Sequence, residues 1–276
     1  MIQRKRITII GIIIVGGIII TGVLALNGYF GGGAKIPEDT FTRGLVAYWS
    51  FDEGAGDIAY DISGNGNNCT IYGAKWTKGK YGSALQFDGV DDYVDCGSQA
   101  SLIFANSDSY SFEHWIKWTG GGSYVLYAGK NSAEEAFLLR AEDNNRFGFR
   151  DSGASQPLFA PNSSDDCLNV WVHLVWVADG LGNIELYKNG TYFDSVTPPN
   201  GTSMHFETFG RSWPFNVYMY EGLIDEVRIY NRALSPEEIR YHYNRGRPVA
   251  HWRFDEGSGT TTYDSSGNEY HGILHE

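Results

Sequence analysis

The stretch "VWVHLVWVADGLGNIELYKNG", residues 170–190, carries the clearest strand signals of the chain. Its first eight residues, Val170–Val177, are almost all apolar, as in a central strand that is buried on both faces. Asn189-Gly190 then lies between two strand-like segments, Ile184–Tyr187 and Thr191–Val196, and this dipeptide favours the type I′ turn of a β-hairpin. The stretch therefore predicts a buried central strand followed by a hairpin.

Similar signals recur on both sides of this stretch. The segment "SYSFEHWIKW", residues 109–118, alternates so that one face holds Tyr110, Phe112, His114, Ile116 and Trp118. The 276-residue chain has 35 glycines and is 15% aromatic, which favours many short strands. One short helix is expected after Ser235, with Pro236 at its first position and Gly246 at its end. We predict an all-β fold, an antiparallel two-sheet jelly-roll sandwich with one short C-terminal helix.

The opening of the predicted domain occurs twice. "LVAYWSFDEGAGDIAYDISGNGNN" (residues 45–68) and "PVAHWRFDEGSGTTTYDSSGNEYH" (residues 248–271) match at 13 of 24 positions, at an offset of 203. We expect a domain at residues 44–246 and the truncated start of a second copy at residues 247–276, because the 29 residues from Pro248 onward cannot bury a jelly-roll core. The alternative is that this tail adds a strand to the sheet edge of a neighbouring molecule.

The N-terminus is typical of an export segment. Residues 1–6 form a basic flank, and the 20 residues Ile7–Leu26 carry no charge. As a helix they would span roughly 30 Å, the thickness of a bilayer core. The pattern predicts a transmembrane helix with a cytoplasmic N-terminus and an extracellular body. The alternative is a signal sequence cleaved after Val23-Leu24-Ala25, which would give a secreted protein. Residues 27–43 are expected to form a linker.

The negative charge of the chain argues against nucleic acid as a partner. The chain carries a formal charge of −12, and the first 26 residues contribute only three basic groups, so the remainder carries −15. Such a body should repel nucleic acid and anionic lipid. We therefore expect no nucleic-acid partner, and contact with a membrane only through the N-terminal segment.

The three cysteines are an odd number and do not form a complete disulfide framework. An exported protein can oxidise its thiols, and Cys69 with Cys96 is the pair expected first, which leaves Cys167 free.

Five stretches, in order, resemble laminin-G-like domains of the concanavalin A-like jelly-roll superfamily. They are "LVAYWSFDEGAG", "KYGSALQFDGVDDYV" (Lys80–Val94), "YSFEHWIKW", the stretch at 170–190, and "GLIDEVRIYNRALSPEEI" (Gly222–Ile239). The resemblance covers residues 44–246 and implies the jelly-roll fold.

A calcium site is the strongest metal candidate. The turn "DISGNGN" (residues 61–67) places Asp61, Ser63 and Asn65 at alternate positions, and hard cations prefer such oxygen ligands. The resemblance implies a structural calcium ion between this turn and Asp225 of the closing strand. The alternative is that Asp61 and Ser63 only satisfy the backbone of a tight turn.

A catalytic site is not expected. Retaining glycosidases hold two carboxyl groups about 5–5.5 Å apart. Glu221 and Asp225 share one strand face but lie about 13 Å apart along it, and Asp225 and Glu226 should face opposite sides of the sheet. His114 and His173 lie in apolar strands and are expected to be core residues.

A ligand site is expected in the loop "GRSWPFN". Trp213 lies beside Arg211 and Asn216, with Tyr218 on the same rim, and exposed aromatic rings stack on sugar faces. The alternative is that Trp213 covers the end of the sandwich. Together these features predict a non-catalytic extracellular module that binds glycan or a surface protein. A structural spacer of a tandem array and a glucanase-type hydrolase are the alternatives, since fold alone does not decide function.

Overall fold

The computed structural model describes residues 9–15, 18–24, 39–120, 124–130, 136–142, 146–151, 168–197, 204–211, 219–245, 252, 254, 257–263 and 271–273. The chain divides into two compact units. One unit is Asp39–Ile239, which contains the two large sheets. The other consists of Met1–Glu38 and Arg240–Glu276 and is described separately below.

Both large sheets are antiparallel. The eight-stranded sheet runs in the order β16 (Thr191–Val196), β15 (Ile184–Lys188), β14 (Trp171–Asp179), β10 (Ser109–Trp118), β19 (Glu221–Tyr230), β7 (Ser83–Asp88) and β6 (Lys75–Lys78), with β3 (Leu45–Trp49) also paired to β19. The seven-stranded sheet runs in the order β13 (Arg146–Asp151), β12 (Ala136–Glu142), β11 (Tyr124–Lys130), β18 (Thr208–Phe209), β8 (Tyr93–Asp95), β5 (Cys69–Tyr72) and β4 (Ile58–Ala59). A short pair, β9 (Ile103–Phe104) with β17 (Met204–His205), and the 3₁₀ turn η1 (Ala100–Leu102) complete this unit's non-helical elements among the described residues.

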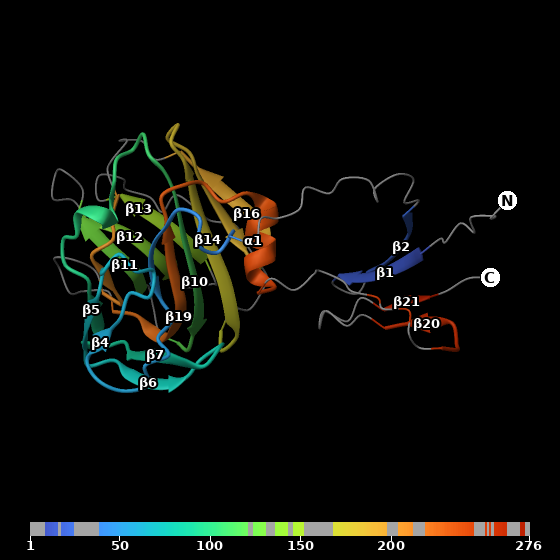
Figure 1. Cartoon of the computed structure of the whole chain (residues 1–276), viewed down its shortest axis with the longest axis horizontal. Coiled ribbons are helices and arrows are strands. Elements are labelled where there is room, and N and C mark those ends of the chain that lie inside the picture. The colour runs from blue at the N-terminus through green and yellow to red at the C-terminus, as the bar shows by residue number, and fades with distance from the viewer. Residues whose placement is uncertain are drawn as a thin grey trace. The chain divides into compact units, whose positions relative to one another are not determined.

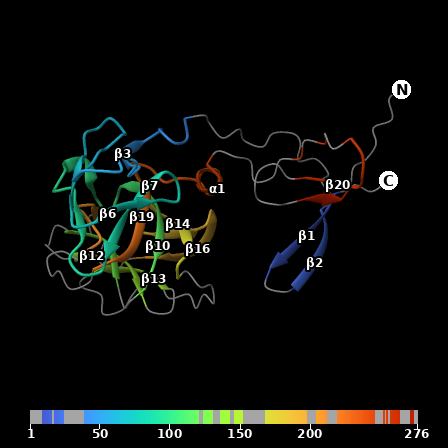
Figure 2. The same ribbon diagram turned by 90° about the horizontal axis from the view of Figure 1, so that it is seen from below.

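The two sheets pack face to face around one apolar core (Figures 1 and 2). Leu85, Ile116 and Ile224 enter this core from the eight-stranded sheet, and Ile71 and Val94 enter it from the seven-stranded sheet. The indole of Trp49 meets the ring of Phe209 edge-on across the layers, with centroids 5.2 Å apart. The predicted all-β sandwich is therefore confirmed for the described residues.

The stretch at residues 170–190 folds as predicted. All but the end residues of β14 are buried, and β14 lies between β10 and β15 inside the sheet. Asn189 and Gly190 join β15 to β16 with φ angles of 50° and 77°. A type I′ turn requires positive φ at both central residues, so this dipeptide fits the tight hairpin.

The outer face of the eight-stranded sheet is also covered. Helix α1 (Pro236–Tyr243) begins with a capping box, in which Glu238 N–H donates to Ser235 Oγ and Ser235 N–H donates to Glu238 Oε2. A second apolar cluster beneath it consists of Val175, Val177, Tyr187, Tyr230, Leu234 and Ile239. The helix ends at Tyr243, and Arg245 just beyond it adopts a left-handed φ of 52°. Gly246, which the sequence placed at the end of the helix, lies outside the described residues.

Strand β19 changes partners at a bulge. Its first half, Glu221–Ile224, pairs with β7, and its second half, Val227–Tyr230, pairs with β3. On its other side, Glu113 of β10 lies opposite Arg228 and Trp115 lies opposite Asp225. Two residues of β19 therefore face one residue of β10, and Glu226 takes a left-handed φ of 55°. The bulge therefore lies at the point where the partner of β19 changes from β7 to β3.

This bulge corrects one expectation from the sequence. Strict alternation placed Asp225 and Glu226 on opposite faces of the sheet. The extra residue of the bulge puts Asp225 and Arg228 on the same face, opposite Trp115 and Glu113. Glu226 forms a hydrogen bond with Arg228 on that face. Alternation cannot anticipate an inserted residue.

The repeated opening has the same local structure in both copies wherever the second copy is described. In the second unit, β20 (Thr261–Thr262) pairs with β21 (Gly272–Ile273), and the register, Thr261↔Ile273 and Thr262↔Gly272, repeats Ile58↔Thr70 and Ala59↔Cys69 at the offset of 203. The left-handed φ angles recur at the same offset, at Phe51 and Phe254, Gly54 and Gly257, and Gly56 and Gly259. The shared residues therefore go with the same local conformation at both places in the chain.

The N-terminal segment differs from the predicted helix over Ile7–Leu26. Ile9–Val15 (β1) and Ile18–Leu24 (β2) form an antiparallel pair, with Ile9 opposite Leu24 and Val15 opposite Ile18. The segment is rich in isoleucine and valine, whose β-branched side chains favour strands. The part of the chain that the structure describes contains no helix with the length and hydropathy needed to span a bilayer.

A clamp around Glu238 fixes the start of the sandwich to its end. Glu238 Oε1 accepts hydrogen bonds from Thr40 Oγ1 (2.9 Å) and Arg43 Nη2 (2.7 Å), and Oε2 accepts from Arg232 Nη1 (2.8 Å) and Ser235 N–H. Burial alone would raise the pKa of Glu238, but the bonds from Arg232, Ser235 and Thr40 lower it to about 2. Thr40 and Arg43, which the sequence placed in a linker, thus contact the compact unit.

We predict that Glu238→Gln lowers the free energy of unfolding at pH 7 by about 1–3 kcal/mol. A carboxylate with a lowered folded-state pKa stabilises the fold above its unfolded pKa, near 4.5, and loses this contribution as pH falls toward 2. Urea unfolding of both proteins should therefore give curves that converge in this acidic range. Glu237→Gln, at the exposed neighbouring position, is the matched control and should change little. A difference that persists unchanged at pH 3 would contradict the account.

Candidate functional site

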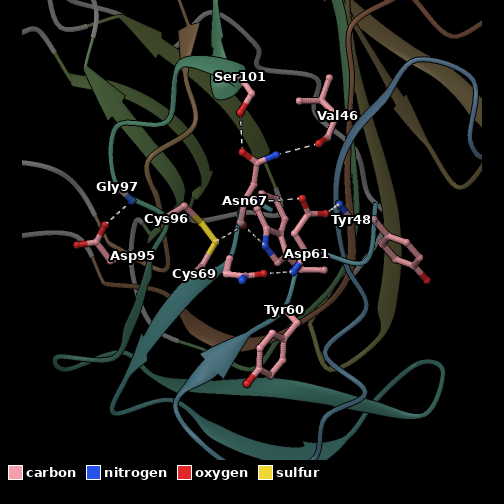
Figure 3. The surroundings of a disulfide bond; sticks show 12 residues. Val46, Tyr48, Tyr60, Asp61, Asn67, Cys69, Asp95, Cys96, Gly97 and Ser101 are labelled. Carbon is pink, nitrogen blue, oxygen red and sulfur yellow. Dashed lines mark hydrogen bonds between the residues drawn. A yellow bond between two sulfur atoms is a disulfide. The ribbon is translucent and has the colours of Figure 1, made fainter. Parts of the chain in front are cut away.

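The "DISGNGN" turn is held by its own side chains, of which Figure 3 shows Asp61 and Asn67. Asp61 Oδ1 accepts the N–H groups of Tyr48 (3.0 Å) and Ser63 (2.9 Å), and Oδ2 accepts the N–H of Asn67 (2.9 Å). Ser63 Oγ and Asn65 Nδ2 both donate to the carbonyl of Val46. Burial would raise the pKa of Asp61, but these bonds lower it overall. Each of these three side chains therefore binds protein backbone.

Asn67 extends this network into the core. Its Nδ2 donates to Val46 O, its carbonyl accepts the indole N–H of Trp49 (2.8 Å), and Ser101 Oγ donates to its Oδ1. Cys69, two residues further on, is joined to Cys96 by a disulfide, the pair expected from the sequence. Cys167 lies outside the described residues. The bridge ties β5 to the end of β8.

Asp225 has different surroundings from Asp61. It lies at the β19 bulge, fully buried, and its Oδ2 accepts the N–H of Tyr81 (3.0 Å). Among the described residues, Oδ1 has no hydrogen-bond partner. Burial raises the pKa of Asp225 to about 7, and the charges of Glu226 and Asp52 add to this, against the N–H groups of Tyr81 and Lys80. The hydrogen-bond partners of Asp61 and of Asp225 described above are different residues.

The loop facing Asp225 is built from glycines that lie close to oxygen atoms. A Cβ on Gly79 would lie 2.6 Å from Asp225 Oδ2 and would collide with the carbonyl of Ser83. A Cβ on Gly82 would collide with the Asp52 carboxylate, which also accepts the N–H of Ser83 at 3.0 Å. Two carboxylates and a carbonyl oxygen thus converge on this glycine loop. This donor set fits a hard cation, whereas the oxygens of Asp61 are already taken up by the turn.

His114 and His173 are both buried within the eight-stranded sheet, as the sequence predicted. His173 Nε2 lies 3.0 Å from Glu113 Oε1, and Arg228 Nη1 lies 3.7 Å from the same oxygen. His114 is fully buried, and burial, reinforced by the charge of His173 and opposed by Glu113, lowers its pKa to about 3. His114 is therefore neutral near pH 7. Glu226 also bonds Arg228 and accepts the hydroxyl of Tyr48, so this network is internally paired.

The outer face of the seven-stranded sheet carries an aromatic stack. Tyr72 and Tyr93 lie opposite each other on β5 and β8, with ring centroids 4.5 Å apart and planes 14° apart. The guanidinium carbon of Arg211 lies 3.4 Å from the Tyr93 centroid, and Arg211 Nη2 lies 3.7 Å from Asp95 Oδ2. Tyr72 remains 45% exposed. We call Tyr72, Tyr93, Arg211 and Asp95 the tyrosine stack.

The stack only partly matches the ligand site expected from the sequence. Arg211 belongs both to the stack and to the predicted site, and it forms an isolated antiparallel β-bridge with Met219 at the other end of the predicted loop. Trp213, Asn216 and Tyr218 lie outside the described residues. Sequence reasoning missed Tyr72 and Tyr93 because they lie 21 positions apart, and only the β5–β8 register brings them together. An exposed tyrosine directly before a glycine, as at Tyr72-Gly73, was the available signal.

Removal of the disulfide should weaken the strands that carry the stack. We predict that Cys69→Ser with Cys96→Ser lowers the free energy of unfolding by about 2–4 kcal/mol, because the bridge restrains a 27-residue separation in the unfolded chain. Denaturant unfolding of oxidised and reduced wild type, beside the double variant, measures this. Reduced wild type should match the variant. Equal midpoints for oxidised and reduced protein would rule out a stabilising bridge.

Comparison with known proteins gives a family match. The sequence profile described as "Concanavalin A-like lectin/glucanases superfamily" matches residues 88–240, more than half of the chain. No curated protein matches.

Solved structures share the fold at low sequence identity. Domain 4 of AbnA, a GH43 extracellular arabinanase from Geobacillus stearothermophilus in complex with arabinotriose, is 21% identical with a TM-score of 0.52, over 71% of this chain and 96% of that chain. Trypanosoma rangeli sialidase in complex with sialic acid is 18% identical with a TM-score of 0.57, over 78% of this chain but only 34% of the sialidase. The binding domain of Paraclostridial Mosquitocidal Protein 1 is 17% identical with a TM-score of 0.53, over 84% and 63%.

Proposed function

This chain belongs to the concanavalin A-like lectin/glucanase superfamily, and we propose that it is an exported, non-catalytic module that binds glycans through the tyrosine stack. The stack is the observation that carries the proposal. An exposed ring backed by a second ring and a guanidinium is a rigid apolar surface, and such surfaces complement the C–H faces of sugars. Asp95 beside it supplies acceptor oxygens for hydroxyl groups.

The burial of Glu113, Asp225 and Glu226 argues against hydrolysis by these three residues. Asp225 and Glu226 are 0% and 1% exposed, so a sugar cannot reach them as they lie in the fold. Glu113 is engaged by His173 and Arg228. A glycosidase needs two carboxyl groups flanking the scissile bond, open to the substrate. The arabinanase domain and the mosquitocidal binding domain lend support by fold alone.

Export is part of the proposal. The uncharged Ile7–Leu26 segment after Arg4, Lys5 and Arg6 supports translocation, either as a retained anchor or as a cleaved signal. The disulfide supports an oxidising destination, since disulfides persist outside the reducing cytosol. The body would then act at the cell surface or in the surrounding medium.

Glycan binding is tested with an array of neutral and anionic polysaccharides that includes arabinotriose. We predict that Tyr72→Ala weakens the strongest response by roughly tenfold or more, because stacking on the exposed ring is lost. Tyr192→Ala is the matched control: Tyr192 is 52% exposed but lies on β16, at the far edge of the other sheet, and its loss should not change binding. No response from any glycan would contradict the proposal and favour a spacer role.

Calcium, as a structural aid, completes the proposal. Asp225, Asp52 and the Ser83 carbonyl are the residues that would hold it, and the ion would neutralise the buried carboxylate whose Oδ1 has no partner among the described residues. Asp61, Ser63 and Asn65 would instead stabilise their turn.

We predict that calcium raises the melting temperature of the chelator-stripped protein and that Asp225→Asn abolishes this rise. Asp61→Asn should lower the melting temperature but keep the response to calcium, because its contacts are to the turn backbone. Differential scanning calorimetry with and without calcium separates the two variants. A calcium response that survives in Asp225→Asn but disappears in Asp61→Asn would place the ion at the turn and overturn this assignment.

A further inference from the structure

An acidic turn borders the tyrosine stack. The carboxylate oxygens of Asp88, Asp91 and Asp92 lie within 4.8 Å of one another, and Asp92 immediately precedes Tyr93. The Asp92 carboxylate also lies against Gly73, the residue after Tyr72, where a Cβ would collide with it. The turn therefore leads directly into Tyr93 and lies against the residue that follows Tyr72. Asp88 and Asp91 are exposed, so their charges are open to solvent near the stack.

The field at this end of the stack is negative. Burial raises the pKa of Asp92, and the charges of Asp88 and Asp91 raise it further, against the Asp88 N–H and the charge of Lys75. Asp95 adds a carboxylate on the same strand face as Tyr93, two residues along β8. An anionic ligand on the exposed ring of Tyr72 would thus meet carboxylates from both directions.

Arg211 offsets the charge of Asp95 beside it, but it is not available to pair with a ligand carboxylate. Its guanidinium is stacked on Tyr93 and faces Asp95, and only 8% of its side chain is exposed. Recognition of a ligand carboxylate by arginine uses the two-pronged edge of the guanidinium, in contact with the ligand. The Arg211 side chain is almost entirely covered, so it supports the ring rather than reaching outward.

From this arrangement we infer that the tyrosine stack selects neutral glycans and rejects glycans that carry carboxylates, such as uronic or sialic acids. The inference deepens the proposed function and rests on it. Neutral sugars offer hydroxyl donors, which carboxylates accept, and a C–H face for the ring of Tyr72. A carboxylate on the sugar brings like charges together, which lowers affinity and slows association. The selectivity therefore differs from that implied by fold likeness to a sialidase.

Matched pairs of probes test this inference on the intact chain. Each pair shares one backbone and differs in charge: methyl-esterified and de-esterified homogalacturonan, and desialylated and sialylated N-glycans on one glycoprotein. Binding is measured by surface plasmon resonance at about 20 mM and about 500 mM salt, since exposed charges are screened at the higher value. We expect the neutral member of each bound pair to bind roughly tenfold more tightly at low salt, and less of a difference at high salt.

Two variants test whether the acidic turn and Tyr72 cause the preference for neutral probes. Asp91→Asn removes one exposed charge of the acidic turn and should narrow the difference between neutral and anionic probes at low salt. Tyr72→Ala should weaken binding of the neutral probes. Equal or tighter binding of the anionic members at low salt would overturn the inference while leaving glycan binding intact. No binding to any probe, in these pairs or in the wider array, would instead contradict the proposed function itself. Neutral selectivity that Tyr72→Ala leaves unchanged would place the site elsewhere and also overturn the inference.

Discussion

The hydrogen bonding of strand β19 is the constraint on which the rest of the sandwich depends. This strand comes from the end of the compact unit, yet it lies between β10 on one side and two strands from the chain's beginning, β3 and β7, on the other. A long strand flanked by two short ones leaves a discontinuity, and the bulge at Glu226 lies there. Asp225, buried at this point, faces the glycine loop that leads into β7.

The same topology explains why the ends of the compact unit are clamped together. Once β3 pairs with β19, the chain just before β3 must run beside the segment that leaves β19 for α1. Glu238 of α1 links these two segments, since it accepts hydrogen bonds from Thr40 and Arg43 of the first and from Arg232 of the second. The "DISGNGN" turn then fixes the chain after β3 through Asp61 and Tyr48. These contacts position β5, and with it Tyr72, next to β8.

Much of the fold could be predicted from the sequence, because it rests on local signals. The apolar run of β14, the Asn189-Gly190 turn and the Ser235 cap each specify structure within a few residues. The repeated opening shows the strength of such signals, since the described parts of the two copies share one register and three left-handed positions. At the N-terminus the structure has a strand pair where hydropathy and length predicted a helix, and β-branched side chains favour strands.

The candidate sites were harder to predict because they depend on register between distant strands. The pairing of Tyr72 with Tyr93 and the orientation of Asp225 both follow from hydrogen-bond ladders, and a one-residue bulge reverses which side chains share a face. The sequence located Arg211 but not the ring on which it packs. It also grouped Asp225 with Asp61, although their contacts lie with different loops.

The most direct test of the account is a titration of the isotope-labelled chain with its tightest-binding neutral glycan, followed by NMR. The account predicts that chemical-shift changes concentrate at Tyr72, Tyr93 and Asp95 and their neighbours on β5 and β8, while β15 and β16 stay unchanged. Changes confined to other surfaces, with β5 and β8 unaffected, would contradict the assignment of ligand binding to the tyrosine stack.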